Sequence, residues 1–262
     1  MSQGRRWFIK SLVVAIIAVM ISMESGCAVS SPDALTTIKD DLLRLPGDMW
    51  TDSKAIIAQP ENVTILVIGG GASGYVRWQH DDQIADHFEN HTTFPRDFDI
   101  AVGSAGNPAT HLALAGAGYL YGLLHEQPQT KQAASSLMEA LALNGLMNIG
   151  LKLAAQDQTP NDEYYGWPSG HTSSTVTLAT VMNEYYGPWV GVPLYALSGL
   201  VIYERMESGE HWASDVIFGA AMGYVIGSTV AQRYKPEIFG MAVVPYIDSL
   251  SNATGLALMK RF

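Results

Sequence analysis

The sequence predicts an all-α fold, a helical bundle of about six core helices followed by a short irregular or hairpin-like C-terminal extension. Apolar stretches long enough for several helical turns recur from residue 109 onward. Proline and glycine residues separate these stretches, as expected between helices. Hydrophobic residues make up 48% of the 262 residues and charged residues 15%, so the chain can bury a full core. The expected apolar helices cover residues 109–124, 130–155, 172–186, 190–206 and 211–232.

The flanking parts of the chain predict less regular elements. Residues 31–50 are polar and indicate a leader with one short helix near 36–45. Residues 62–76 are apolar and rich in small side chains, which favours a helix packed closely on a neighbour. A charged segment follows at 77–96, and the tail at 241–262 alternates short apolar pieces with turn residues, which predicts the hairpin-like extension.

These elements suggest four regions. Residues 1–27 are expected to be an export signal, and residues 28–60 a leader or linker. The helical domain is expected at 61–240, and the C-terminal extension at 241–262. The sequence contains no internal repeat and no low-complexity tract.

The N-terminus has the features of a secretory signal. Arg5 and Arg6 precede an apolar run at 11–22, and together with the following Phe8-Ile9-Lys10 they resemble a twin-arginine export signal. Cys27, the only cysteine, stands where a lipobox places its lipidated residue. We therefore expect a periplasmic lipoprotein of a bacterial envelope, anchored to the membrane through Cys27. A cleaved soluble protein and an uncleaved anchor are the alternatives.

The acidity of the chain limits its partners. Removal of residues 1–27 takes away three cations and one acid, so the formal charge moves from −10 to −12. This charge argues against binding to nucleic acid or to anionic headgroups by simple electrostatics. Uncharged stretches occur at 100–125, 187–203 and 216–232. Most are shorter than about 20 residues, and Lys and Arg do not gather in alternate loops. We therefore expect a water-soluble bundle, with an integral membrane body as the alternative.

One candidate motif is Arg205-x5-His211-x3-Asp215. On a helix, His211 and Asp215 would share one face. Asp215 could then accept a hydrogen bond from one ring nitrogen and leave the other as a nucleophile. The fork of Arg205 suits bidentate binding of phosphate oxygens. The plainer interpretation is a surface His–Asp pair beside an unrelated arginine.

A second motif, Pro168-Ser169-Gly170-His171, precedes an apolar stretch that predicts a helix. The free N–H groups at the start of a helix form an anion site, and Gly170 permits close approach of a ligand to the backbone. Ser169 adds a hydroxyl donor, and His171 could give a proton to a leaving oxygen. The alternative is an ordinary helix cap with an incidental histidine.

Together, these two motifs resemble those of the type-2 phosphatidic acid phosphatase superfamily, which also contains bacterial nonspecific acid phosphatases and vanadium haloperoxidases. The first motif of that superfamily, Lys-x6-Arg-Pro, has an altered counterpart here in Lys152-x6-Thr159-Pro160. The resemblance covers about residues 107–234.

The resemblance implies a metal-independent phosphoric monoester hydrolase that acts through a phosphohistidine, with lipid or polyprenyl phosphates among its substrates and no cofactor. His211 would attack phosphorus, Asp215 would orient its ring, and His171 would protonate the leaving oxygen. The implied phosphate-binding residues are Lys152, Arg205, Ser169, Gly170 and Thr159.

Two departures from the superfamily pattern weaken the expected phosphate site. Thr159 stands where the superfamily has arginine, and Glu204 stands where it has serine. A charge-assisted contact contributes roughly 1.5–3 kcal/mol, so the loss of one is significant. Two alternatives therefore remain: a catalytically weak envelope lipoprotein that uses the fold for binding, and a vanadate-dependent haloperoxidase. For a phosphatase, vanadate would be an inhibitor rather than a cofactor.

A glycine-rich segment offers a competing interpretation. Gly69-x-Gly71-x-x-Gly74 follows an apolar run at 63–68 and fits a dinucleotide-binding fingerprint. However, the helix would continue with the bulky residues 75–78, and no second strand ending in an acid follows at the expected distance. We interpret the segment as a helix with a small-residue face, and a flavin or nicotinamide protein as the alternative.

Overall fold

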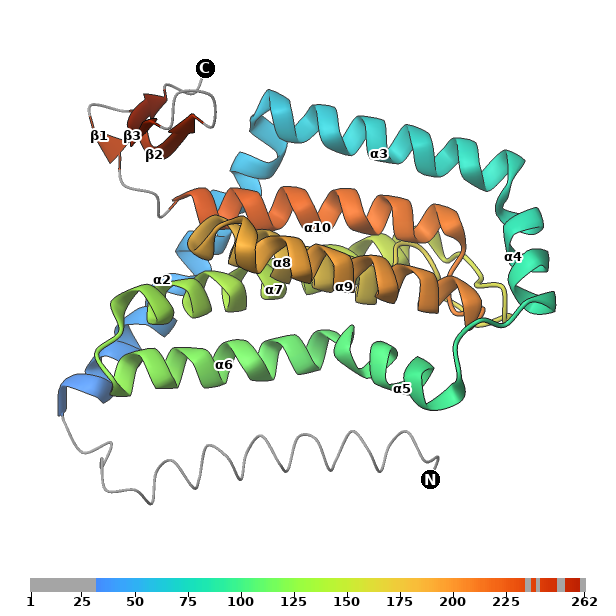
Figure 1. Cartoon of the computed structure of the whole chain (residues 1–262), viewed down its shortest axis with the longest axis horizontal. Coiled ribbons are helices and arrows are strands. Elements are labelled where there is room, and N and C mark those ends of the chain that lie inside the picture. Colours follow the sequence, from blue (N-terminus) through green and yellow to red (C-terminus); the bar gives the residue numbers. More distant parts are fainter. Residues whose placement is uncertain (1–31, 234–236, 239–240, 249–252, 260–262) are drawn as a thin grey trace.

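The computed structural model describes residues 32–233 together with the strand segments 237–238, 241–248 and 253–259 (Figure 1). The described part of the chain is a helical bundle followed by a small antiparallel sheet, so the predicted all-α fold with a hairpin-like extension is confirmed. The helices are α2 (Pro32–Ala58), α3 (Pro60–Gln79), α4 (Asp81–Asn90), α5 (Arg96–Ala105), α6 (Pro108–Leu124), α7 (Pro128–Ala155), α8 (Gly170–Tyr186), α9 (Pro188–Glu207) and α10 (Ala213–Arg233).

The C-terminal extension consists of β1 (Glu237–Ile238), β2 (Met241–Asp248) and β3 (Ala253–Met259), hydrogen-bonded in that order. Strands β2 and β3 are antiparallel, with Asp248 opposite Ala253 and Ala242 opposite Met259. The export signal, the linker start and Cys27 lie outside the described residues.

Proline sets several helix starts. Helices α3, α6, α7 and α9 each begin with proline, which has no N–H to leave unpaired and has a backbone angle suited to the first helical turn. Before α6, the Asn107 side chain also caps the helix by accepting a hydrogen bond from Ala109 N at 2.9 Å. These signals explain why the five apolar helices lie close to their predicted positions.

The N-terminal third differs from the prediction. The expected short helix at 36–45 is a 27-residue helix, α2, that continues through Pro46. The charged segment at 77–96 contains α4, and residues 96–105 form α5, which the sequence analysis did not predict. Asp97 and Asp99 in the first turn of α5 match the positive end of the helix dipole, a signal that could have identified it.

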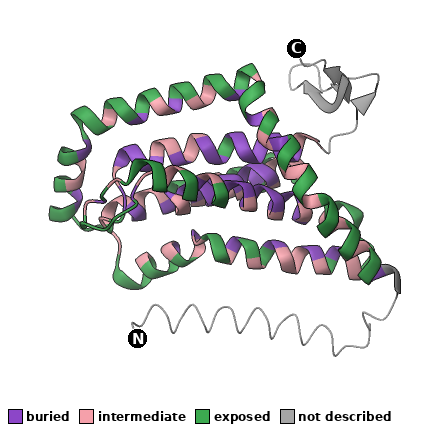
Figure 2. Cartoon of the chain, turned by 180° about the vertical axis from the view of Figure 1, so that it is seen from behind, coloured by how far each residue is buried: buried purple, intermediate pink, exposed green. Residues whose placement is uncertain are grey.

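Helices α8 and α10 pack against each other at the centre, with α3, α7 and α9 around them (Figures 1 and 2). Glycines permit this contact: a Cβ on Gly219 would lie 2.8 Å from Ser169 O, and one on Gly223 would lie 2.3 Å from Ser173 O. Several buried hydroxyls of α8 are satisfied within the helix, as where Thr177 Oγ1 donates to Ser173 O at 2.8 Å. The centre of the bundle is therefore held together by close backbone contact.

The glycine-rich segment lies within α3, as interpreted from its sequence. Gly69 faces α10, where an added Cβ would lie 2.5 Å from Ala221 Cβ. The small residues therefore allow α3 to approach α10, and the apolar run at 63–68 before them is helical, not the strand that a dinucleotide fold requires.

The described helices differ in whether they are long and apolar enough to cross a membrane. One of them, α10, is long and apolar enough to cross a membrane, and 72% of the relevant window is buried inside the bundle. Helices α2 and α3 are long and apolar enough only when taken as a pair, and the chain bends by 69° between them.

Candidate active site

The three motifs meet at one end of the bundle, where α7 and α9 end and α8 and α10 begin. Lys152 is in the last turn of α7, Arg205 in the last turn of α9, and Asp215 in the first turn of α10. Residues far apart in sequence are thus brought together by the alternating directions of the helices.

His211 is hydrogen-bonded to Asp215, with 3.1 Å between Nδ1 and Oδ2. The predicted reason for this contact was wrong, because α10 begins at Ala213 and His211 precedes it. The chain turns at Gly209, whose φ is +69°, and the carboxylate of Asp215 folds back over the helix start. The same Oδ2 accepts a hydrogen bond from Trp212 N at 3.1 Å.

This arrangement defines the state of His211. Donation from Nδ1 to Asp215 leaves Nε2 with a lone pair, as a nucleophile requires. The imidazole is 8% exposed and Asp215 is fully buried. Burial lowers the pKa of His211 in spite of the opposing effect of Asp215, which keeps the ring neutral.

The Pro-Ser-Gly-His turn is tied directly to this pair. Ser169 N donates to Asp215 O at 3.1 Å, and Ser169 Oγ caps α8 by accepting from Thr172 N at 3.4 Å. Gly170 is the first residue of α8, so its N–H and that of His171 are at the positive end of the helix. The turn therefore has the backbone geometry of an anion site.

His171 lies within electrostatic range of the other motif residues. Burial, followed by the charges of Arg205 and His211, lowers the pKa of His171 to about 3. Lys152 contributes in the same direction. His171 is therefore neutral at physiological pH in this state, in an environment that would favour a bound anion.

Lys152 reaches into the same region. Its Nζ donates to Gly166 O at 2.8 Å and also to Tyr165 O, and burial lowers its pKa. Asp215 opposes this shift, which indicates that the ammonium and the carboxylate are close. One donor of Lys152 remains for a ligand after these two bonds.

The guanidinium of Arg205 is already paired. Its Nε donates to Glu204 Oε2 at 2.5 Å and its Nη2 donates to Glu204 Oε1, while Nη1 donates to Glu210. Glu204 is 1% exposed, and Gly103 of α5 leaves room for the pair, since an added Cβ would lie 2.8 Å from Arg205 Nη2. The positive charge of Arg205 is thus balanced within the protein.

Comparison with known proteins identifies the family of the region that carries the motifs. A model of the PAP2 superfamily matches residues 151–238, which contain all three motifs. This region belongs to the PAP2 superfamily. The match therefore confirms the resemblance seen in the sequence.

The relatives of the PAP2 region are phosphatases. A lipid A 1-phosphatase of Porphyromonas gingivalis is 30% identical over 100 residues, which cover 37% of this chain and 22% of that protein. A lipid A 4'-phosphatase of the same organism is 35% identical over 75 residues, covering 27% and 30%. The chain thus spans less than a third of the length of either relative.

A crystal structure of a transmembrane PAP2 type phosphatidylglycerolphosphate phosphatase from Bacillus subtilis has a similar fold. Its TM-score is 0.55 at 15% identity, over 65% of this chain and 94% of that one. At that identity the likeness concerns the fold alone.

Thr159, where PAP2 proteins have arginine, is part of the loop structure. Its hydroxyl donates to Glu163 O at 3.1 Å and Asn161 Oδ1 at 2.5 Å, and accepts from Glu163 N at 3.0 Å. The side chain is also in contact range of Gly166, where a Cβ would lie 3.0 Å from Thr159 Cγ2. The hydroxyl is thus already engaged within the loop.

Asn148 lies beside the candidate site, and the sequence analysis did not single it out. It lies one turn before Lys152 on α7 and is 6% exposed. Its Nδ2 donates to Ser173 Oγ at 2.9 Å, and its Oδ1 would lie 3.6 Å from a Cβ on Gly170. The i, i+4 spacing to Lys152 was the available signal.

Buried polar atoms without a hydrogen-bond partner occur in this region and at other places in the described part of the chain. Within the described part of the chain, Asn148 Oδ1, Thr172 Oγ1 and Asp215 Oδ1 are buried without a hydrogen-bond partner. Buried polar groups are normally paired, so these three atoms are candidates for pairing with a polar ligand.

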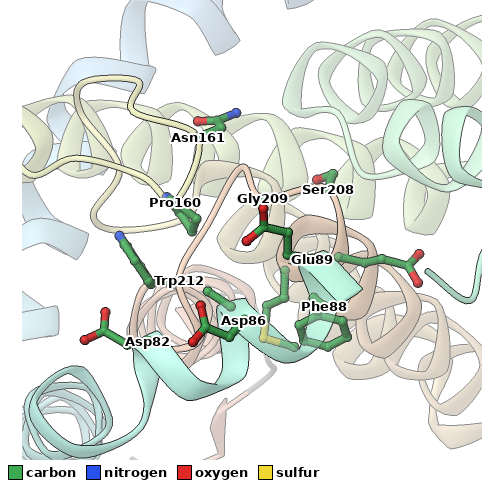
Figure 3. A pocket seen from close by; sticks show the side chains of 12 residues that line it. Asp82, Asp86, Phe88, Glu89, Pro160, Asn161, Ser208, Gly209 and Trp212 are labelled. Carbon is green, nitrogen blue, oxygen red and sulfur yellow. The ribbon is translucent and has the colours of Figure 1, made fainter. Parts of the chain in front are cut away.

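A cavity of about 470 Å³ lies beside the turn that leads to His211 (Figure 3). Trp212, Phe88 and Pro160 supply apolar surface, and the carboxylates of α4 line the same space. A second cavity of about 290 Å³ borders Arg205 and Glu210. The acidic lining of both cavities disfavours highly charged anions near the site. The carboxylates of the larger cavity belong to Asp82, Asp86, Glu89 and Glu207.

Proposed function

We propose that this protein hydrolyses phosphate monoesters through a phosphohistidine on His211. The observation that carries the proposal is the buried His211–Asp215 pair, which leaves Nε2 as a lone-pair nucleophile, with Asp215 O bonded to Ser169 N just before α8. The phosphatase names of both curated relatives support it. No metal or other cofactor takes part in the proposed reaction.

The proposed reaction has two steps. His211 Nε2 attacks phosphorus of a monoanionic ester, and the bond from phosphorus to the ester oxygen breaks. His171, neutral beforehand, takes the proton that the ester brings and passes it to the leaving oxygen. Water then attacks phosphorus while His171 accepts its proton, and the bond from phosphorus to Nε2 of His211 breaks. His171 passes this proton to the released phosphate, so both histidines return to their starting states.

Stabilisation of the phosphoryl oxygens falls to the remaining motif residues. The N–H groups at the start of α8, the Ser169 hydroxyl, Lys152 and the unused donors of Arg205 are the candidates. Thr159 contributes through the loop that carries it, because its hydroxyl already makes three hydrogen bonds there.

We propose lipid phosphates as the substrate class. Both curated relatives act on lipid A by name, and exposed aromatic residues offer surface for acyl chains. Trp78, next to Arg77 on α3, is 87% exposed, and Trp189, at the opposite end of α9 from Arg205, is 92% exposed. Export through residues 1–27, with Cys27 as a periplasmic lipid anchor, would place the domain beside such substrates.

The proposal is tested with the full chain against a chromogenic phosphate ester and against lipid phosphates in vesicles. His211→Ala and His171→Ala should abolish turnover, and His125→Ala, which changes an exposed histidine, should not. An acid-labile phosphoryl label that is present in the wild type and absent in His211→Ala identifies the intermediate. Turnover that survives in His211→Ala would refute the mechanism.

A binding role is the second candidate, favoured by the pairing of Arg205 with Glu204 and Glu210. In that case titration with phosphate or vanadate would show binding that depends on Arg205, without turnover of any ester. Halide oxidation by a vanadate-loaded protein has no observation of its own in its favour.

A further inference from the structure

A row of polar residues on α3 and at the start of α4 faces the candidate site. Ser73 and Arg77 are four residues apart on α3, so they share one face of that helix, and Asp81, the first residue of α4, lies 3.8 Å from Arg77. Helix α3 runs beside α10 (Figure 1). All three residues lie outside the segment that matches the PAP2 superfamily.

Ser73 connects two of the motif segments. Its Oγ donates to Ser214 O at 2.8 Å, and Trp167 Nε1 donates to the same Oγ at 3.2 Å. Ser73 is 4% exposed, so both bonds are shielded from water. The turn before Ser169 and the start of α10 are thereby held to the same point on α3.

Arg77 reaches the remaining segment. Its Nη2 donates to Asp157 Oδ1 at 2.5 Å, in the loop that carries Thr159. Its guanidinium carbon lies 5.1 Å from the centre of the Trp212 ring, within the range of a cation–π contact. It is also 3.8 Å from Asp81 Oδ2, so it partly balances that charge.

Asp81 holds the first turn of α10. Its Oδ1 accepts a hydrogen bond from Ser214 N at 3.0 Å, and its Oδ2 accepts one from Ser214 Oγ at 2.5 Å. The first N–H groups of a helix have no partner inside the helix, and here a buried carboxylate of another helix supplies one. Asp81 is 2% exposed.

We propose that Asp81, assisted by Ser73 and Arg77, is a positioning residue that holds Asp215 in place to orient His211. Ser214 adjoins Asp215, so a shift of the Ser214 backbone moves the carboxylate that fixes the His211 ring. This inference rests on the proposed phosphatase function for its kinetic consequence. Its structural consequence, the tautomer of His211, does not depend on turnover.

The test compares Asp81→Ala, Asp81→Asn and the control Asp97→Ala. Asp97 is likewise in the first turn of a helix, but it is exposed. The tautomer of His211 is read from the nitrogen chemical shifts of its ring, and kcat and KM are measured on the same samples. Thermal unfolding shows whether each variant is folded.

In the wild type and in Asp97→Ala, the His211 ring should carry its proton on Nδ1. In Asp81→Ala it should be a mixture of tautomers, and kcat should fall about 10- to 100-fold with KM little changed. Asp81→Asn keeps an acceptor for Ser214 N, so its effects should be smaller. If Asp81→Ala does not fold, a partial shift of the tautomer in Asp81→Asn serves as the readout.

The outcomes separate the two proposals. If folded Asp81 variants keep the wild-type tautomer of His211 and an unchanged kcat, the positioning role is overturned and the proposed phosphatase function is unaffected. A disturbed His211 tautomer in Asp81→Ala, together with a wild-type chain that hydrolyses no phosphate ester, would support the positioning role and refute the phosphatase function.

Discussion

The Nε and Nη2 of Arg205 both donate to the carboxylate of its neighbour Glu204. This pair of donors would otherwise be able to bind a phosphate group in a bidentate manner. Burial raises the pKa of Glu204, although Arg205 opposes this effect. A phosphate ester that binds here would therefore contact an arginine that already forms ion pairs with two carboxylates. Of these two partners Glu210 is the more accessible, with its side chain 46% exposed.

Glu210→Gln should strengthen the binding of phosphate. Removal of one negative charge near the anion gains about 1 kcal/mol when the site is wet, so KM and the inhibition constant of vanadate should fall roughly 3- to 10-fold. Steady-state kinetics with a chromogenic ester provide the measurement. Glu61→Gln, on the exposed start of α3, is the control. An equal change in both variants would show that Glu210 does not compete locally.

Asp215→Asn should lower kcat about 10²- to 10⁴-fold, because an amide no longer favours the tautomer with the proton on Nδ1. The cavity left by this substitution is negligible, so the unfolding temperature should change far less than the activity. Single-turnover kinetics would show whether formation of the phosphohistidine is the affected step. A kcat within a few-fold of the wild type would mean that Asp215 does not orient His211.

The pH dependence of kcat/KM should have its maximum on the acid side. His211 acts in its neutral form, and burial lowers its pKa below 6.5, so activity should persist until the pH falls through that lowered value. His171 is also neutral, with a pKa of about 3, so the proton must arrive with the monoanionic ester. Phosphate esters lose this proton near pH 6. A maximum above pH 7 would contradict this assignment of protons.

Gly223→Ala should destabilise the bundle. The new methyl group would lie 2.3 Å from Ser173 O, so α8 and α10 would have to separate. Overpacking of this kind costs about 1–3 kcal/mol, more than the helix propensity gained from alanine. Gly71→Ala is the matched control, because an added Cβ there meets nothing within 4 Å. Chemical denaturation measures both, and equal stabilities would disprove the close contact.

Thr159→Val should reduce stability, since Glu163 N and Asn161 Oδ1 both lose a partner. Asn161 and Glu163 are exposed, and Glu163 N also donates to Asn161 Oδ1 at 3.4 Å, so the loss should be only about 0.5–1.5 kcal/mol. We expect KM to change little, because the hydroxyl is engaged with the loop. A large rise in KM with unchanged stability would instead make Thr159 a direct phosphate ligand.

The sequence was sufficient to predict the central helices and the motif residues, because proline starts, glycine breaks and apolar periodicity are local signals. It was insufficient where contacts between residues distant in the chain determine where a helix starts or ends. Pro46 stays inside α2, and no local pattern near His211 revealed that α10 begins only at Ala213. The contact between His211 and Asp215 was predicted correctly for the wrong geometric reason.

The pairing of Arg205 with Glu210 could not be predicted from composition either. Glu204 was recognised as a departure from the superfamily pattern, but only the folded chain shows that both carboxylates reach the same guanidinium. The role of Asp81 was equally hidden, because its partner Ser214 lies 133 residues away in the chain.

The bonds from Ser73 and Asp81 to Ser214 also bear on how the protein can be divided for experiments. A truncated version starting at residue 151 would contain every motif and the whole region that matches the superfamily. It would nevertheless leave the amide of Ser214 open to solvent. It would also lack Ser73 and Arg77, which contact Trp167 and Trp212. Domain boundaries drawn from the motifs alone would thus yield a fragment that contains all the motif residues but lacks the contacts that hold Asp215 and His211 in place.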